Sequence, residues 1–541
     1  MPLHAAETPP AKAAIASAHP LATQAGLSVL GAGGNAFDAA VAVSAALAVV
    51  EPMGSGLGGG GFWLLHRAED RRDVMIDGRE RAPLAATRDM YLDKNGAVIP
   101  GLSVDGPLAA AIPGTPAALA HLARHYGRLP LAKSLAPAIA LARNGFAVDE
   151  HYLKLAQFRL TALRASPAAA AIFLHQDALP DLGQLIKQAD LAHTLATLAE
   201  QGRDGFYQGP LAERLVAGVN SAGGIWSLDD LAQYEVVERT PVTGEYRGWR
   251  VISAAPPSSG GVALISMLNM LAAYDLDKLD AATRTHLTVE AMRRAYRDRA
   301  EYLGDPDFVK VPVERLIHPL YAAGLRATIH PERATPSALL PGGEEPTRGA
   351  DTSHFSVLDR EGNRVAATLS VNLPFGAAFV PPGTGVLLND EMDDFSAKPG
   401  TPNAYGLVGF DANAIAPGKR PLSSMSPTFI ESERGIAILG TPGGSRIISM
   451  VLLSLLDIVH GGDAVSSVAV KRFHHQFLPD LIQYEPGALD EKLAAALIAR
   501  GHALKQGNRD YGNMQTVWWD KVRNTVQAAS DPRGGGAAEV R

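Results

Sequence analysis

Residues 351–372 read DTSHFSVLDREGNRVAATLSVN, and this stretch decides the fold. Polar and apolar residues alternate after Thr352, which is typical of a β-strand, and Gly362 and Asn363 lie where a hairpin would turn. β propensity alone favours an ordinary strand residue at Thr352. The pattern therefore predicts a β-hairpin with a threonine at the head of its first strand.

Thr352 is also a candidate nucleophile. Its hydroxyl reacts poorly until a base removes the proton, and one available base is the α-amino group of the same residue. That amine exists only if the bond between Asp351 and Thr352 is cut. The reference pKa of an α-amino group is about 7.7–8.0, which suits a general base near neutral pH. The stretch therefore predicts a latent N-terminal nucleophile.

Composition narrows the class of protein. The 541 residues are 47% hydrophobic, which is enough for a large core. A net charge of −7 and a pI near 6.2, without a basic stripe, argue against a nucleic-acid partner and favour a small-molecule substrate. There are no cysteines, which excludes disulfides, thiolate metal sites and a cysteine nucleophile.

Neither the N-terminus nor the apolar runs predict a membrane segment. Residues 1–20 are rich in Ala and Pro and lack the basic and apolar regions of a signal peptide. The longest apolar runs, 39–50 and 447–456, are shorter than the roughly 20 residues that span a bilayer. We expect a soluble protein.

A glycine-rich run separates a predicted buried helix at Asn35–Val50 from a predicted strand at Phe62–His66. Its glycines fit the dinucleotide-binding spacing G-x-G-x-x-G, but that fingerprint needs a strand before it and a helix after it. Because the order here is reversed, we expect these glycines to allow close backbone approach near the active site. They are Gly56, Gly58 and Gly61.

Periodicity predicts further elements along the chain. Helices are expected within 107–145 and 187–217. From Asp351 onward strands dominate. The predicted strands are 249–253, 386–388 and 436–439, a helix is expected after 256–261, and another at 447–459.

Several motifs, in this order along the chain, resemble signatures of the gamma-glutamyltransferase (gamma-glutamyltranspeptidase) family. The resemblance covers nearly the whole chain and implies an α+β fold, a four-layer αββα sandwich of the N-terminal nucleophile hydrolase type. It also implies one intertwined domain made jointly by a large piece, 1–351, and a small piece, 352–541. The motifs are Gly33–Ala40, Gly58–Phe62, Pro257–Gly261, Glu301–Pro306, Asp351–Asp359, Leu387–Ser396, Arg420–Thr428, Gly440–Arg446 and Ala529–Arg533.

The resemblance implies four catalytic residues. Thr352 would first attack the carbonyl of Asp351 to cut the chain and then attack the substrate. Ser370 would support the nucleophile through its hydroxyl, although most relatives carry threonine there and at the position of Ser353. Gly443 and Gly444 precede a predicted helix near Ile447, where backbone N–H groups and the helix terminus would stabilise an oxyanion.

The same resemblance implies a site for an amino-acid head group. Arg79 would bind the α-carboxylate, because its planar fork binds a carboxylate bidentately, and Ser423 and Ser424 would complete that site. The α-amino group would be held by Asn372, Glu391 and Asp394. A lid loop over 392–420 would place Tyr405 over the substrate.

The activity so implied is cleavage of γ-glutamyl amides such as glutathione through an acyl-enzyme on Thr352. The acyl group would pass to water or to an amino-acid or dipeptide acceptor, with no cofactor or metal. The resemblance places such enzymes in the periplasm or outside the cell, and the sequence leaves a cytoplasmic location open.

Two alternatives to this activity remain open. A glutaryl-cephalosporin acylase of the same family would bind an acyl group without an α-amino function, which the acidic pair Glu391 and Asp394 disfavours. An uncleaved, inactive binding protein is disfavoured by the intact Thr352.

His474 and His475 are interpreted as structural, because neighbours on a helix point about 100° apart and no third ligand is evident.

Overall fold

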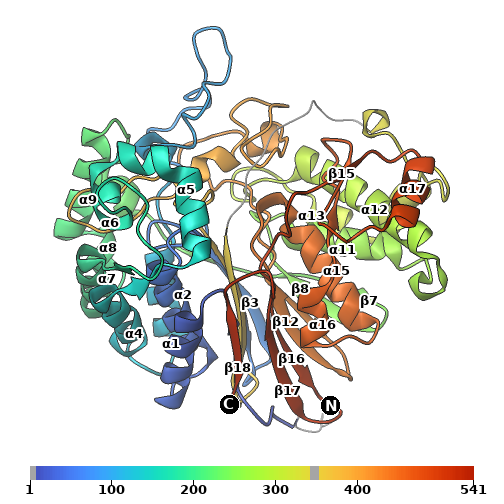
Figure 1. The fold of residues 1–541 in the computed structure, drawn as a ribbon, viewed down its shortest axis with the longest axis horizontal. Coiled ribbons are helices and arrows are strands. Elements are labelled where there is room, and N and C mark those ends of the chain that lie inside the picture. Colours follow the sequence, from blue (N-terminus) through green and yellow to red (C-terminus); the bar gives the residue numbers. More distant parts are fainter. Residues whose placement is uncertain (1–7, 341–351) are drawn as a thin grey trace.

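Two antiparallel sheets lie side by side at the centre of the molecule (Figure 1). The computed structural model describes residues 8–340 and 352–541. The first sheet has the order β18 (Ala537–Val540), β1 (Ala14–Ser17), β9 (Ser353–Leu358), β10 (Arg364–Ser370), β2 (Gly60–Arg67), β3 (Arg72–Gly78) and β6 (Val237–Arg239). The second has the order β17 (Thr525–Ser530), β16 (Gln515–Asp520), β12 (Gly435–Gly440), β11 (Thr428–Glu431), β8 (Trp249–Ser253) and β7 (Val242–Tyr246).

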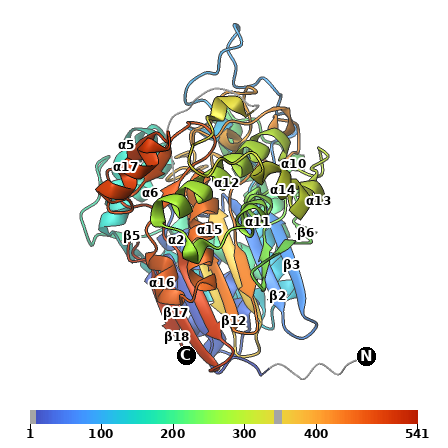
Figure 2. The ribbon, with the colours of Figure 1, turned by 90° about the vertical axis from the view of Figure 1, so that its right-hand side faces the viewer.

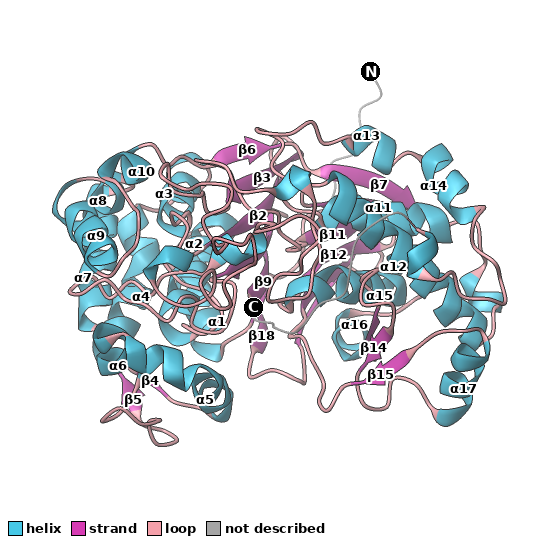
Figure 3. Cartoon of the chain, turned by 90° about the horizontal axis from the view of Figure 1, so that it is seen from above, coloured by secondary structure: helices cyan, strands magenta, loops and turns pink. Residues whose placement is uncertain are grey.

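Helices cover the outer side of each sheet, as the view from above shows (Figure 3). Beside the first sheet are α1 (Pro20–Gly31), α2 (Ala36–Val50), α3 (Thr115–His125), α4 (Leu131–Asn144), α5 (Glu150–Ala165), α6 (Pro167–Phe173), α7 (Ala189–Gln201), α8 (Asp204–Tyr207), α9 (Gly209–Ser221) and α10 (Leu228–Ala232). Beside the second are α11 (Gly260–Leu271), α12 (Ala281–Tyr302), α13 (Val313–Leu316), α14 (Pro319–Arg326), α15 (Ile447–Val459), α16 (Ala464–Ala469) and α17 (Glu491–Ala499), of which α11, α12 and α15 lie in front of the strands in Figure 2.

Two small sheets complete the fold. One joins β4 (Phe146–Ala147) to β5 (Leu185–Ile186), and the other contains β13 (Phe473–His474), β14 (Ile482–Tyr484) and β15 (Leu504–Gln506). Among the residues that the structure describes, no helix combines the length and the apolar character needed to cross a membrane.

The first sheet is buried on both faces, which explains its nearly continuous apolar strands. Along β2, Trp63 and Leu65 pack into the core beneath α1 and α2, whereas Phe62 and Leu64 pack into the core shared with the second sheet. Side chains alternate between the faces of a strand, so each face feeds a different core. This confirms the predicted four-layer αββα sandwich.

Both sheets combine strands from either side of residue 352. In the first sheet β9 and β10 lie between β1 and β2, and in the second β11 pairs with β8. The two parts of the chain therefore share both hydrophobic cores, and neither part has a complete sheet of its own.

The predicted hairpin is confirmed. Asp359 N donates to Asn363 O at 3.0 Å, the Asp359 carboxylate accepts from Asn363 N at 2.9 Å, and Gly362 has a φ of 91°. A left-handed residue at that point favours glycine. The turn sets the register that brings the start of β9 next to the end of β10.

Close approach explains the glycine-rich run between α2 and β2. A Cβ on Gly58 would lie 2.0 Å from Leu387 O, and a Cβ on Gly59 would lie 2.0 Å from Ser370 O. Helix α2 comes before these glycines and strand β2 after them, as predicted from the sequence. The run therefore packs the backbone beside Ser370 and is no dinucleotide loop.

Two sequence predictions are wrong. Residues 386–388 do not form a strand, because only an isolated bridge joins Leu388 to Gly58, where the chain passes behind the glycine run. His474 lies at the end of the short strand β13 and His475 follows it, so the pair is not on a helix. The apolar run at 386–388 reflects burial without a neighbouring strand to pair with.

Candidate active site

Thr352 lies directly before β9, at one end of the first sheet, and is 6% exposed. Asp351 lies outside the described residues. The pairing of Ser353 with Leu369 places Thr352 opposite Ser370, the last residue of β10. Ser370 Oγ accepts a hydrogen bond from Asn372 N at 2.8 Å. The hairpin register thus brings the predicted nucleophile and its predicted helper to the same end of the sheet.

A small pocket opens at this end of the sheet. A larger hollow beside α3 contains none of the predicted residues, so size alone would point to the wrong place. Nine of the eleven predicted site residues line the small pocket, and only Gly443 and Glu391 do not. The nine are Arg79, Thr352, Ser370, Asn372, Asp394, Tyr405, Ser423, Ser424 and Gly444.

The turn at Gly443 and Gly444 connects β12 to a short 3₁₀ turn and then to α15. Both glycines have positive φ, 136° and 56°, which explains the residue type. Among the described residues, no acceptor is hydrogen-bonded to the N–H of either glycine. Gly444 lines the pocket and Gly443 directly precedes it, so two backbone donors close to the start of a helix are a suitable arrangement for an oxyanion.

Arg79 is buried among carboxylates. Its Nη2 lies 2.5 Å from Asp394 Oδ2, and its Nη1 lies 2.6 Å from Glu391 Oε2 and 3.5 Å from Glu80 Oε2. Burial alone would lower the pKa of Arg79, but Glu391, Glu80 and Asp394 raise it. In this structure Arg79, predicted to bind the α-carboxylate, is therefore paired with the acidic residues predicted to bind the α-amino group.

Glu391 lies behind Arg79 and does not line the pocket. Its contact with Arg79 is an ion pair by distance only, since no donor among the described residues meets hydrogen-bond geometry with either carboxylate oxygen. Burial raises the pKa of Glu391 well above its usual range, and Arg79 only partly offsets this. Asp394 is the acidic residue that faces the pocket, and its other oxygen accepts from Asn403 Nδ2 at 3.0 Å.

Ser423 and Ser424 each accept a hydrogen bond from the protein. Met425 N donates to Ser423 Oγ at 3.1 Å, and Arg299 Nη2 donates to Ser424 Oγ at 3.2 Å. Each hydroxyl has one proton, and within the described part of the chain neither proton has an acceptor. Both O–H groups are therefore available to donate to an anion in the pocket.

The predicted lid loop crosses the pocket and is anchored at Tyr405. The Tyr405 hydroxyl donates to Asn372 O at 2.5 Å. Behind the lid, Gln476 Nε2 donates to Gly406 O at 2.9 Å, while its Oε1 accepts from Ser445 Oγ at 2.7 Å. Gln476 thus connects the lid to the glycine turn.

The sequence did not single out several residues of this site. Ser445 and Met425 fall inside quoted motifs, and Asn403 falls inside the expected lid, so those stretches were the available signal. Gln476 and Arg299 stand in stretches to which no substrate role was given. The other lining residues that were missed are Leu407 and Ile447.

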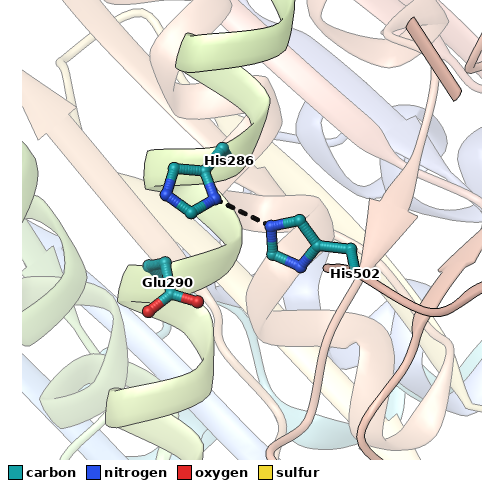
Figure 4. Close-up of side chains that lie close together, drawn as sticks. All are labelled: His286, Glu290 and His502. Carbon is teal, nitrogen blue, oxygen red and sulfur yellow. Dashed lines mark hydrogen bonds between the residues drawn. The ribbon is translucent and has the colours of Figure 1, made fainter. Parts of the chain in front are cut away.

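A buried cluster of His286, Glu290 and His502 has side chains of the kind that bind metals (Figure 4). His286 Nδ1 is hydrogen-bonded to His502 Nε2 at 2.8 Å, and His286 Nε2 to His330 O at 2.8 Å. The carboxylate of Glu290 contacts two arginines, Arg293 and Arg294. A metal would have to displace these partners, so the cluster fits a structural role better.

The fold defines the class of protein. A four-layer αββα sandwich is the architecture of N-terminal nucleophile hydrolases, and a solved member is similar throughout. The cephalosporin acylase from Bacillus halodurans superposes with a TM-score of 0.85 at 28% identity, covering 100% of this chain and 97% of that one.

The sequence places the chain more narrowly: it belongs to the gamma-glutamyltranspeptidase family, whose model matches residues 22–540. It is 44% identical over 495 residues to the glutathione hydrolase proenzyme of Pseudomonas sp. strain A14, covering 90% of this chain and 86% of that protein. It is 43% identical over 527 residues to the glutathione hydrolase proenzyme of Escherichia coli strain K12, covering 96% and 90%. The predicted family is confirmed.

Proposed function

We propose that this protein is a self-processing γ-glutamyl hydrolase and transferase that uses Thr352 as its nucleophile. One observation carries the proposal: Thr352, a glycine of the turn, a cation, a carboxylate and two serine hydroxyls line one small pocket. Glutathione is the expected donor, and amino acids or dipeptides are the expected acceptors. The processed enzyme would be a heterodimer of residues 1–351 and 352–541, acting in the periplasm or outside the cell.

Self-cleavage would begin with attack of Thr352 Oγ1 on the carbonyl carbon of Asp351. The C–N bond breaks as the C–O bond forms and the hydroxyl proton passes to the nitrogen, which converts the peptide into an ester and leaves an amine on Thr352. Water then hydrolyses the ester, giving a carboxylate at Asp351 and restoring the hydroxyl of Thr352 beside its free α-amino group. Cleavage thus creates the base that the next reaction needs.

Turnover would use the same hydroxyl. The α-amine of Thr352 takes the hydroxyl proton as Oγ1 attacks the γ-carbonyl carbon of the donor, and the oxyanion is held at the N–H groups of Gly443 and Gly444. Collapse of the intermediate breaks the amide C–N bond, and the leaving amine receives the proton. Water or an acceptor amine then attacks the acyl ester and restores Thr352, while Ser370 supports the hydroxyl.

Recognition of the donor would be an exchange of ion pairs. A γ-glutamyl group carries both an α-ammonium and an α-carboxylate, so it can replace the contact between Arg79 and Asp394 without leaving either charge unpaired. Its carboxylate would bind Arg79, Ser423 and Ser424. Its ammonium would bind Asp394 and Asn372, with Glu391 lying behind Arg79, and Tyr405 would cover the group.

A glutaryl-cephalosporin acylase is the second candidate, because a solved cephalosporin acylase shares this fold over the whole chain. A glutaryl group would pair with Arg79 but would leave Asp394 without a cation. Leaving a largely buried carboxylate unpaired is unfavourable, so the γ-glutamyl reading is better supported. An uncleaved binding protein, the third candidate, gives no reason for a nucleophile at the pocket.

A denaturing gel and one set of rates test the proposal. We expect two fragments on the gel, and release of p-nitroaniline from γ-glutamyl-p-nitroanilide that accelerates when a dipeptide acceptor is added. Faster turnover of the glutaryl analogue would favour the acylase. A single uncut chain without activity on either compound would contradict both enzymes.

A further inference from the structure

Arg299 is a buried arginine behind Ser424, one of the two serines that line the pocket. It lies on α12 and is 4% exposed. Its Nε donates to Ser259 Oγ at 3.0 Å and its Nη2 to Ser424 Oγ at 3.2 Å. Among the described residues, no carboxylate lies within ion-pair distance of Arg299, whereas Arg79 contacts three. The two arginines therefore differ in how their charge is balanced.

The charge of Arg299 persists despite its burial. Burial lowers the pKa of Arg299 to about 10, while Asp394 acts in the opposite direction, so the group stays protonated at neutral pH. Keeping a buried cation without an adjacent anion is unfavourable. A ligand carboxylate beyond Ser424 would supply that anion.

Arg299 also fixes the direction in which Ser424 can donate. Because the guanidinium has no acceptor atom, Ser424 Oγ must accept from it, and the single hydroxyl proton is left to point elsewhere. Ser424 lines the pocket. We propose that Arg299 is a positioning residue that aims the Ser424 hydroxyl at the donor's α-carboxylate and selects, by its charge, donors that carry one. This inference rests on the proposed function.

The helix that carries Arg299 also reaches the glycine turn. One turn earlier on α12, the Tyr296 hydroxyl donates to Ser445 O, next to Gly444. Residues three apart lie on one helix face. A single rigid face of α12 therefore contacts both the loop that would bind the carboxylate and the turn that would hold the oxyanion, which fixes the separation of the two subsites.

Two anilides separate charge selection from a general loss of structure. γ-Glutamyl-p-nitroanilide carries the α-carboxylate, and 4-aminobutyryl-p-nitroanilide is the same donor without it. We expect Arg299→Met to raise KM for the first compound roughly tenfold or more and to change KM for the second little, with kcat less affected. Arg299→Lys keeps the charge and should restore part of the preference.

Arg294→Met is the matched control. Arg294 is an equally buried arginine of α12, but it contacts Glu290 and Thr328 and lies away from the pocket. The Arg294→Met substitution should lower the melting temperature without changing the preference between the two anilides. If Arg299→Met weakens both anilides by the same factor, as a purely structural change would, the inference is overturned.

Calorimetric binding of L-glutamate and of 4-aminobutyrate tests the role of Arg299 without any measurement of turnover. If the wild type cleaves neither anilide, the proposed function fails, yet Arg299 is still tested. Loss of L-glutamate binding in Arg299→Met but not in Arg294→Met supports the inference. Equal L-glutamate affinity of Arg299→Met and wild type, or no binding by wild type, overturns it.

Discussion

The ring of Tyr405 occupies the space that a side chain on Gly444 would need. A Cβ on Gly444 would lie 2.3 Å from both Cδ1 and Cε1 of Tyr405. The residue that covers the pocket therefore packs directly on the turn proposed to hold the oxyanion. Since Gly444 also has a φ of 56°, glycine is required there for two independent reasons.

Gly444→Ala should reduce kcat by about 100-fold or more, because the methyl group displaces either Tyr405 or the Gly444 N–H that is proposed to hold the oxyanion. Rates with γ-glutamyl-p-nitroanilide provide the measurement. In a Tyr405→Ala background the same substitution should cause a smaller loss, since the clash is gone. Equal losses in both backgrounds would show that the contact with Tyr405 is irrelevant.

Thr352→Ala should give one uncut chain without activity, because both of the proposed reactions use the Thr352 hydroxyl. Thr352→Ser, which keeps a hydroxyl, is the matched control and should still be cut. A denaturing gel with mass analysis of the new N-terminus is the measurement. Normal two-fragment migration of Thr352→Ala would refute the assignment of the nucleophile.

Arg79→Lys should weaken donor binding while self-cleavage proceeds. A lysine retains the charge but loses the planar fork that can pair with two carboxylates at once. We expect KM for γ-glutamyl-p-nitroanilide to rise roughly tenfold or more. An unchanged KM in a fully processed variant would contradict a role in carboxylate binding.

Asp394→Asn should narrow the preference for γ-glutamyl over glutaryl anilides. The carboxylate would pair with the donor's ammonium, which a glutaryl group lacks, so kcat/KM should fall much more for the γ-glutamyl compound. Both substrates are measured on wild type and variant. If the wild type already prefers the glutaryl compound, the acylase reading replaces the transferase reading.

Because His354 is buried, the free energy of unfolding should fall as the pH is lowered. Burial lowers the pKa of His354 to about 3, so in the folded state it stays neutral at pH 5, whereas the unfolded state binds a proton below about 6.5. Its contribution to stability is therefore present at pH 7 and is lost as the pH falls. Between pH 7 and pH 5 this loss is about 2 kcal/mol.

His354→Gln in the uncleaved Thr352→Ala background tests this linkage by urea unfolding at both pH values. Buried carboxylates act in the opposite direction, as burial raises the pKa of Asp393 to about 6. The comparison with the parent removes their contribution. The variant should lose about 2 kcal/mol less on acidification, and an identical loss would contradict the neutral state of His354.

The sequence by itself determined the hairpin, the helix before the glycine run and the residue types of the pocket. These depend on alternation, on turn chemistry at Gly362 and on motifs of consecutive residues, all of which are local. Local patterns failed at 386–388, because an apolar run predicts burial and not a hydrogen-bonding neighbour. They also gave no sign that β13 would hold His474, a strand too short to have a period.

The tertiary structure alone decided how the charges of the site balance. Arg79 lies 315 positions from Asp394, and Arg299 lies 125 positions from Ser424, so no sequence spacing predicts either contact. Which acid faces the pocket and which lies behind Arg79 depends on how the lid packs over the sheet edge. Burial and desolvation set the charge of these groups, and both arise only once distant segments have folded against one another.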